Sequence, residues 1–264
     1  MSIFKLLRIV VLLSVLLVLV IGARMTERRL ASWGKPVWVT IYPIAATADA
    51  ATISYARSVT EENFQAINDF LERELSLYTV TLTPPVHFQI APFSQELPPT
   101  MPADRLDTVA VALWSLKMRW WAWRKGRTDG LVTPDIQMFV LYHKLGGQSE
   151  MSISVGMRKG MYGLVKAYAG QQHSARNQVI LAHELMHVLG ASDKYTFATG
   201  DPIFPEGYSD PNKRPLFPQV TAEIMGGRIA LTAYESVMPE SLEQCRIGQR
   251  TAEEIGLFSR LVDH

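Results

Sequence analysis

Two spacings of apolar residues alternate along this chain. Short runs rich in Val, Ile, Phe and Tyr are typical of buried β-strands. Such runs occupy residues 37–44, 86–90 and 136–142, and weaker candidates lie at 151–155 and 164–169. We therefore expect a sheet assembled from separated parts of the sequence.

Helical spacing of apolar residues fills the intervals between these runs. We expect helices at 58–77, at 105–125, in the stretch that leads into His183, and at 251–262. The first would begin with a capping box at Ser58 and Glu61. Asp104, Ser174 and Thr251 would begin the other three, in that order. This order of elements predicts an α/β fold (an α+β layer arrangement) with a mixed, twisted sheet and packed helices. Prolines interrupt the part between 202 and 218, which predicts a loop-rich C-terminal part.

The amino terminus has a different pattern, because Ile9–Ala23 carries no charge and is rich in Val and Leu. A helix of this length spans about 22 Å, against a hydrocarbon core of about 30 Å. Snorkelling of Lys5 and Arg8 extends it. We expect a signal anchor or single transmembrane helix at 1–23, a polar linker at 24–35 and a catalytic domain at 36–264.

This segment implies the lipid bilayer as a partner, with the domain on the periplasmic or extracytoplasmic side. The alternative is secretion after cleavage of a signal peptide. Basic residues on both sides leave the orientation open.

The composition of the chain limits its possible size class, partners and disulfides, but it does not indicate an activity. The chain has 264 residues, 48% of them hydrophobic, so it can bury a sizeable core. Its net charge of +1 gives no reason to expect nucleic acid as a partner. Its single cysteine, Cys245, cannot form an internal disulfide.

The candidate chemistry lies in the stretch H-E-L-M-H-V-L-G-A-S-D, residues 183–193. Histidines four residues apart share one helix face, with Cβ atoms about 5–6 Å apart, so His183 and His187 can reach one Zn²⁺ ion. Gly190 can end the helix in a left-handed turn that returns the chain to the metal, where Asp193 would be the third ligand. Glu184 is placed to act as general base on a zinc-activated water. These residues predict a zinc-dependent hydrolase that cleaves peptide bonds.

At these residues the chain resembles the metzincin clan of zinc metallopeptidases, whose signature is H-E-x-x-H-x-x-G-x-x-H, with Asp in the last place in some members. The resemblance implies a methionine turn beneath the zinc, for which Met225 is the candidate. It also implies a metzincin-like arrangement in which a sheet-edge strand pairs with extended substrate. Residues 161–169 are the candidate for that strand, and an internal strand is an equal alternative.

Several assignments stay open at this point. Glu223 is an alternative third ligand, because a second helix supplies a glutamate in other enzymes with this motif. Tyr195 would orient a ligand or donate to the developing oxyanion, or else is an ordinary packed tyrosine. The alternative functions are a zinc amide hydrolase acting on a non-peptide or cell-wall substrate, and a non-catalytic binding or assembly protein.

The helix over 105–125 combines tryptophans with basic residues. That combination suits a membrane interface. We favour the other reading, a core helix with a basic solvent face.

Overall fold

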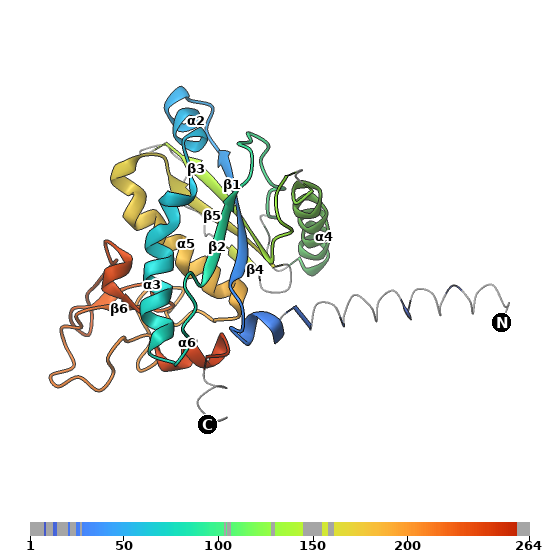
Figure 1. Cartoon of the computed structure of the whole chain (residues 1–264). Helices are drawn as coiled ribbons and strands as arrows, with labels where there is room; N and C mark the ends of the chain where they lie inside the picture. Colours follow the sequence, from blue (N-terminus) through green and yellow to red (C-terminus); the bar gives the residue numbers. More distant parts are fainter. Residues whose placement is uncertain are drawn as a thin grey trace.

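The computed structural model describes residues 28–257 except 103, 105, 106, 128, 129, 145–154 and 158–160, together with a few isolated residues before 28. Its centre is a five-stranded sheet (Figure 1). Four strands are parallel to their neighbours, and the fifth is antiparallel. In spatial order the strands are β2 (Val86–Ile90), β1 (Val37–Ala45), β3 (Ile136–His143), β5 (Tyr162–Tyr168) and β4 (Val155–Met157).

The strand sequences are apolar throughout because both faces of the sheet are covered. Along β3, Ile136, Met138 and Val140 belong to one buried cluster. The alternate residues Phe139 and Leu141 belong to a second cluster on the opposite face. Successive side chains of a strand point to opposite faces, so one continuous apolar run supplies both layers of core.

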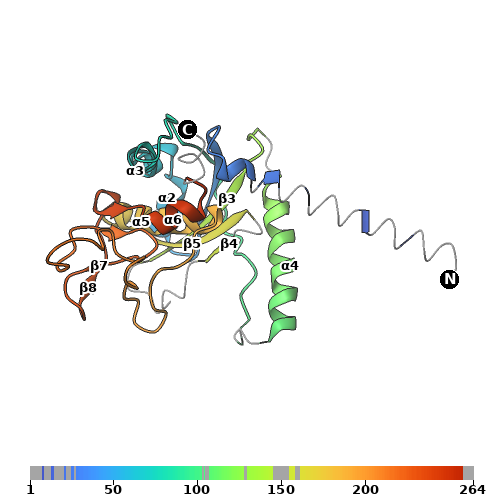
Figure 2. The ribbon, with the colours of Figure 1, turned by 90° about the horizontal axis from the view of Figure 1, so that it is seen from below.

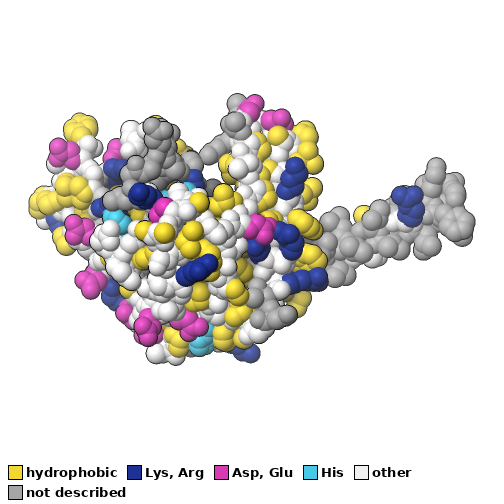
Figure 3. All heavy atoms as spheres, turned by 90° about the horizontal axis from the view of Figure 1, so that it is seen from above, with side chains coloured by type: hydrophobic (Ala, Val, Ile, Leu, Met, Phe, Trp, Pro, Cys, Tyr) yellow, Lys and Arg dark blue, Asp and Glu magenta, His cyan; other side chains and the backbone are white. Residues whose placement is uncertain are grey.

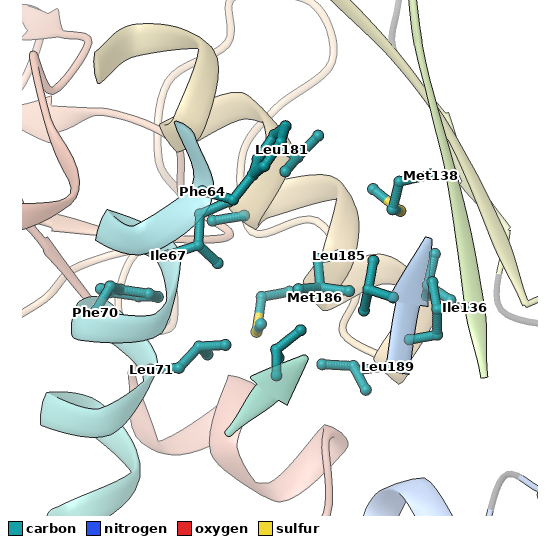
Figure 4. Close-up of a cluster of buried hydrophobic side chains, with 14 of the residues drawn as sticks. Phe64, Ile67, Phe70, Leu71, Ile136, Met138, Leu181, Leu185, Met186 and Leu189 are labelled. Atoms are coloured by element: carbon teal, nitrogen blue, oxygen red, sulfur yellow. The ribbon is translucent and has the colours of Figure 1, made fainter. Parts of the chain in front are cut away.

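The larger cluster lies between the sheet and the helices α3 (Gln65–Ser76) and α5 (Ser174–Leu189). Figure 4 shows Leu185 and Leu189 of α5 near Ile136 at the sheet, and Phe70 and Leu71 of α3 on the other side of Met186. These side chains are almost wholly buried. This packing fixes α5, and with it the motif, against the rigid sheet.

The smaller cluster is formed with α4 (Thr108–Lys125), which stands on the other face of the sheet (Figures 1 and 2). Trp114, Met118 and Trp121 are its buried side chains against the sheet. The expectation of a core helix is confirmed for this face of α4.

The C-terminal part is irregular, as the prolines predicted. Between α5 and residue 222 the chain forms turns and isolated bridges without a named strand or helix. The short elements that follow are β6 (Ala222–Glu223), β7 (Ile229–Ala230), β8 (Ser236–Val237), β9 (Cys245–Arg246) and α6 (Gln249–Glu254).

Four predictions about helices were wrong in detail. The capping box is formed by Thr60 and Asn63, and it opens a 3-10 turn (Glu61–Phe64) ahead of α3. Ser58 instead ends an unpredicted helix, α2 (Ala50–Arg57). Asp107, not Asp104, caps α4. In each case the sequence offered neighbouring polar residues, and the packing of the apolar face selected among them.

The other two differences concern α5 and α6. A 3-10 turn ending at His173 precedes α5, so His173 is the N-cap and Ser174 is the first helical residue. Helix α6 begins at Gln249, before Thr251. The Thr251 side chain is buried and donates to Glu223 instead. The predicted continuation to residue 262 lies outside the described residues.

Strand β5 is internal, since β3 and β4 pair with its two sides. The open choice between an edge and an internal position for residues 161–169 is therefore settled as internal. The last strand of the described sheet is β4, whose expected range of 151–155 lies mostly outside the described residues.

The stretch expected to be a linker contributes to the core. Leu30 and Trp33 are buried, and the Trp33 indole donates to the carbonyl of Ile255. Within the described residues no helix has the length and apolar character needed to cross a bilayer. The apolar run Ile9–Ala23 falls almost entirely outside them.

Candidate metal centre

Helix α5 presents His183 and His187 on one face, one turn apart, as the spacing predicted. Their rings lie 4.7 Å apart between centroids and are nearly perpendicular. Glu184, one residue along the helix, is buried. Close packing of the opposite face of α5 against the core holds all three side chains on a fixed backbone.

Gly190 ends the helix as expected. Its φ is +122°, a left-handed conformation that side-chain-bearing residues rarely adopt. Its N–H donates to the carbonyl of Met186 at 2.9 Å. The chain then turns back toward the histidines and brings Asp193 beside them.

Three ligand-type atoms converge at this point. The Asp193 Oδ1 atom lies 3.2 Å from His183 Nε2 and 2.9 Å from His187 Nε2. Tetrahedral ligands at about 2.0–2.1 Å from zinc would be about 3.3 Å from one another. Within the part of the chain that the structure describes, these three residues form the one cluster of this kind.

The other ring nitrogen of each histidine fixes its orientation. His183 Nδ1 lies 2.8 Å from the carbonyl oxygen of Ile224, and His187 Nδ1 lies 2.9 Å from that of Ala191. A carbonyl can only accept, so each Nδ1 carries a proton and each Nε2 faces the site; in the neutral form of the ring, Nε2 presents a lone pair there. Two such lone pairs and a carboxylate oxygen in contact repel one another unless a cation lies between them. The donor set therefore fits a divalent metal, and two imidazoles with one carboxylate suit zinc.

The pKa shifts of the site also favour a bound cation. Burial would raise the pKa of Asp193, but its contacts with the two imidazoles outweigh burial and hold the pKa below its usual range. Burial would lower the pKa of His187, yet the Asp193 carboxylate raises it. A cation is thus favoured at this point, and protons compete with a metal for it.

Tyr195 lies at the edge of the cluster, with its ring 6.2 Å from that of His183. Burial, the negative charge of Asp193 and a hydrogen bond to Asp193 raise the pKa of Tyr195 to about 12. The phenol is therefore protonated at neutral pH. It is in contact with the predicted third ligand, Asp193.

Met225 is fully buried. The preceding carbonyl, that of Ile224, accepts from His183, and the Met225 carbonyl accepts from the backbone N–H of Lys194 at 2.9 Å. The turn therefore connects to one histidine and to the residue after Asp193. Gly226 lets it approach the chain closely, because a Cβ there would meet the Gly207 carbonyl oxygen at 2.3 Å.

Glu223, the alternative ligand, has its carboxylate oxygens occupied elsewhere. One oxygen accepts from the backbone N–H groups of Met225 and Gly226, both at 2.7 Å. The other accepts from Gly248 N–H and from the Thr251 hydroxyl. The side chain is fully buried, which raises its pKa, and the donated hydrogen bonds oppose that rise. Its contacts make it a brace between the turn at Met225 and α6.

A second glutamate, Glu254 of α6, braces the residues on either side of Asp193. Its carboxylate accepts from the Ser192 N–H and hydroxyl at 2.9 and 2.8 Å. It also pairs with the buried Lys194 ammonium at 2.8 Å. Lys194 in turn donates to the Ser192 carbonyl. The sequence held no signal for this partner, because it lies 60 residues after Lys194 along the chain.

Comparisons with known proteins add little. No family model matches the sequence, and no curated protein matches it. Among solved structures, a chain from a "Structure of a chaperone-substrate complex" aligns at 13% identity with a TM-score of 0.42. The alignment covers 86% of this chain and 35% of that one, so this chain spans about a third of its length. A likeness at this level carries nothing about function.

Proposed function

We propose that this protein is a membrane-anchored zinc metallopeptidase. The observation that supports this most is the convergence of His183, His187 and Asp193, with each imidazole turned by a backbone carbonyl so that Nε2 faces the same point. A structural zinc site uses four protein ligands, whereas three ligands leave a position for substrate or water. Three ligands beside a buried glutamate therefore favour catalysis over a structural or binding role.

Zinc, when bound, would polarise the scissile carbonyl and lower the pKa of a water toward about 7. The Glu184 carboxylate is close enough to this cluster for its charge to raise the pKa values of His187 and Tyr195. It takes the proton of the attacking water and returns it to the leaving amine. The protonated Tyr195 phenol donates to the substrate oxygen as that oxygen becomes negative.

A peptide substrate is supported by the sheet. Strand β4 pairs on one side with β5, and it packs against α5. An extended peptide could add to the other side of such a strand through main-chain hydrogen bonds. The resemblance to metzincins gives the edge strand this role, and β4 replaces residues 161–169 as its candidate.

Membrane anchoring rests on the apolar run Ile9–Ala23 and the basic residues around it. The proposal places the domain on the periplasmic or extracytoplasmic side. Flotation of the full chain with vesicles, followed by protease treatment of intact cells, tests both parts. A chain that stays at the bottom of the gradient contradicts anchoring.

The activity is tested by Glu184→Gln in a digest of a broad peptide library. The amide keeps the shape of the side chain but cannot take a proton, so we expect bound zinc to stay near one equivalent while cleavage falls by about 10²-fold or more. Glu206→Gln, an exposed glutamate in the loop-rich part, is the matched control. Full cleavage by Glu184→Gln would contradict the mechanism.

The ligand set is tested separately by zinc analysis of Asp193→Ala and Glu223→Gln. We expect the first variant to lose zinc and the second to keep it, because the Glu223 carboxylate is held by four donors. The reverse result would make Glu223 the third ligand.

A further inference from the structure

Helix α4 is apolar on two opposite faces. Its buried face packs on the sheet, but large apolar side chains at helical spacing also follow its outer face. They are 53–67% exposed, and they are Val109, Leu113, Leu116, Trp120 and Trp123. A surface helix of a soluble domain is normally polar on its outer side. We call these five residues the outer stripe of α4.

The charges that helix α4 itself carries around the outer stripe are of one sign, and at its C-terminal end Arg124 and Lys125 pair with Glu96 of the preceding loop. Helix α4 contains no acidic residue. At about 100° per residue, Lys117 and Arg124 fall on one flank of the stripe and Arg119 on the other. The Arg124 guanidinium lies 5.1 Å from the centre of the Trp120 ring, and that of Arg127 lies 3.8 Å from the centre of the Trp123 ring. Figure 3 shows hydrophobic side chains, yellow, and Lys and Arg side chains, dark blue, on the projecting lobe of the molecule.

A hollow of about 670 Å³ lies at the C-terminal end of the same helix. Arg119, Trp123, Arg127 and Tyr162 are among the residues that line it. The Tyr162 side chain is 2% exposed, and its hydroxyl has no hydrogen-bond partner among the described residues. Two guanidinium groups with one buried hydroxyl can bind the phosphate of a lipid headgroup.

The described residues that follow the apolar amino-terminal run in the sequence lie near this hollow. Arg29, a few residues after Ala23, forms an ion pair with Asp135. Asp135 directly follows Pro134, which lines the hollow together with Trp123. A chain anchored through Ile9–Ala23 would therefore hold this end of α4 close to the bilayer.

We infer that the outer stripe of α4 lies in the interface of a bilayer that contains anionic phospholipid. Tryptophan is enriched at the level of the headgroups, and flanking Lys and Arg side chains attract anionic lipid. This inference rests on the proposed anchoring and extends it: the domain is held at two points, so the candidate metal centre keeps a fixed orientation above the membrane.

The test places one fluorescent label on the full chain. Cys245 is fully buried, which leaves an introduced cysteine as the reactive thiol. Leu116→Cys puts an environment-sensitive dye on the outer stripe. Leu77→Cys is the matched control, because Leu77 is a leucine of similar exposure, 67% against 64%, next to α3 on the other face of the sheet. Both proteins are reconstituted into vesicles of phosphatidylcholine with or without phosphatidylglycerol.

With phosphatidylglycerol present, we expect the dye at position 116 to be quenched by brominated lipid and to be several-fold less accessible to iodide than the dye at position 77. Replacing both Lys117 and Arg119 by glutamine should reduce this shielding about as much as omitting phosphatidylglycerol. Circular dichroism of each variant checks that the fold is retained.

Three results would overturn the inference. Vesicles that float with the protein while position 116 stays open to iodide would leave the anchor intact and refute the role of α4. Shielding that appears without vesicles and grows with protein concentration would assign the stripe to a second copy of the chain. A protein that does not float at all would refute both the anchor and the second contact.

Discussion

The candidate metal centre is assembled from two halves that are held in different ways. Its helical half, His183, Glu184 and His187, stands on α5, whose other side is fixed by apolar packing on the sheet and on α3 (Figure 4). Its loop half, Asp193 and the turn at Met225, has little regular structure around it. Two buried or half-buried glutamates hold that half through hydrogen bonds and one ion pair. Apolar packing thus supplies the rigidity of one half, and polar networks supply that of the other.

The largest expected effect is on the loop half, with Glu223→Ala. Removal of the carboxylate leaves four donors buried without an acceptor, and each unsatisfied group costs about 1–3 kcal/mol. We expect the free energy of unfolding to fall by about 4 kcal/mol or more, measured by chemical denaturation. Glu243→Ala, at an exposed glutamate nearby, is the control. A loss below about 1 kcal/mol would mean that the loop half is not held by this network.

Leu185→Ala tests the helical half. Leu185 is 1% exposed in the main core, so its truncation leaves a cavity and should cost about 2–5 kcal/mol. Leu77→Ala, at an exposed leucine, should cost little. If the comparison is right, Leu185→Ala lowers the melting temperature while the remaining folded protein keeps nearly normal zinc affinity, because the rest of the buried face still holds His183 and His187 on α5 and the braces around Asp193 are untouched.

Glu254→Gln separates positioning from stability. The amide weakens the contacts to Ser192 and Lys194 without touching Asp193, so zinc affinity should fall by less than the roughly 10–100-fold that is typical for a direct partner of a metal ligand. Glu253→Gln, its neighbour on α6, is the matched control. Unchanged affinity in Glu254→Gln would show that the bend at Gly190 is enough to place the ligand.

The smallest effect is a pH dependence in the chelator-treated protein. Burial would raise the pKa of Glu254, but its bonds to Lys194 and Ser192 outweigh burial and lower it from 4.5. For a carboxyl whose folded pKa is depressed, the stabilisation is complete above the unfolded pKa and is lost as pH falls through the folded pKa. The difference in melting temperature between wild type and Glu254→Gln should therefore be constant from pH 6 to about 5. It should decrease as the pH falls below 4.5, the ordinary pKa of a glutamate carboxyl. A difference that grows on acidification would contradict this sign.

The features that the sequence predicted correctly are those that depend on local, regular spacing of residues. The strand at 86–90 and the end of α4 at Lys125 were predicted at their observed positions, and the spacing of His183 and His187 on a helix was confirmed. Those features depend on residues a few positions apart. The start of α4 and the capping box were misplaced, because several polar residues near each helix start could serve as the cap and only packing chooses one.

The sequence by itself determined the helical half of the site and the turn at Gly190. A helix converts fixed spacing into a shared face, and glycine alone tolerates the φ of that turn without strain. Only the tertiary structure decided that Glu223 and Glu254 are braces, that β5 is internal and that α4 exposes a second apolar face. Each of these depends on contacts between residues far apart in the chain, and such contacts leave no periodic mark in the sequence.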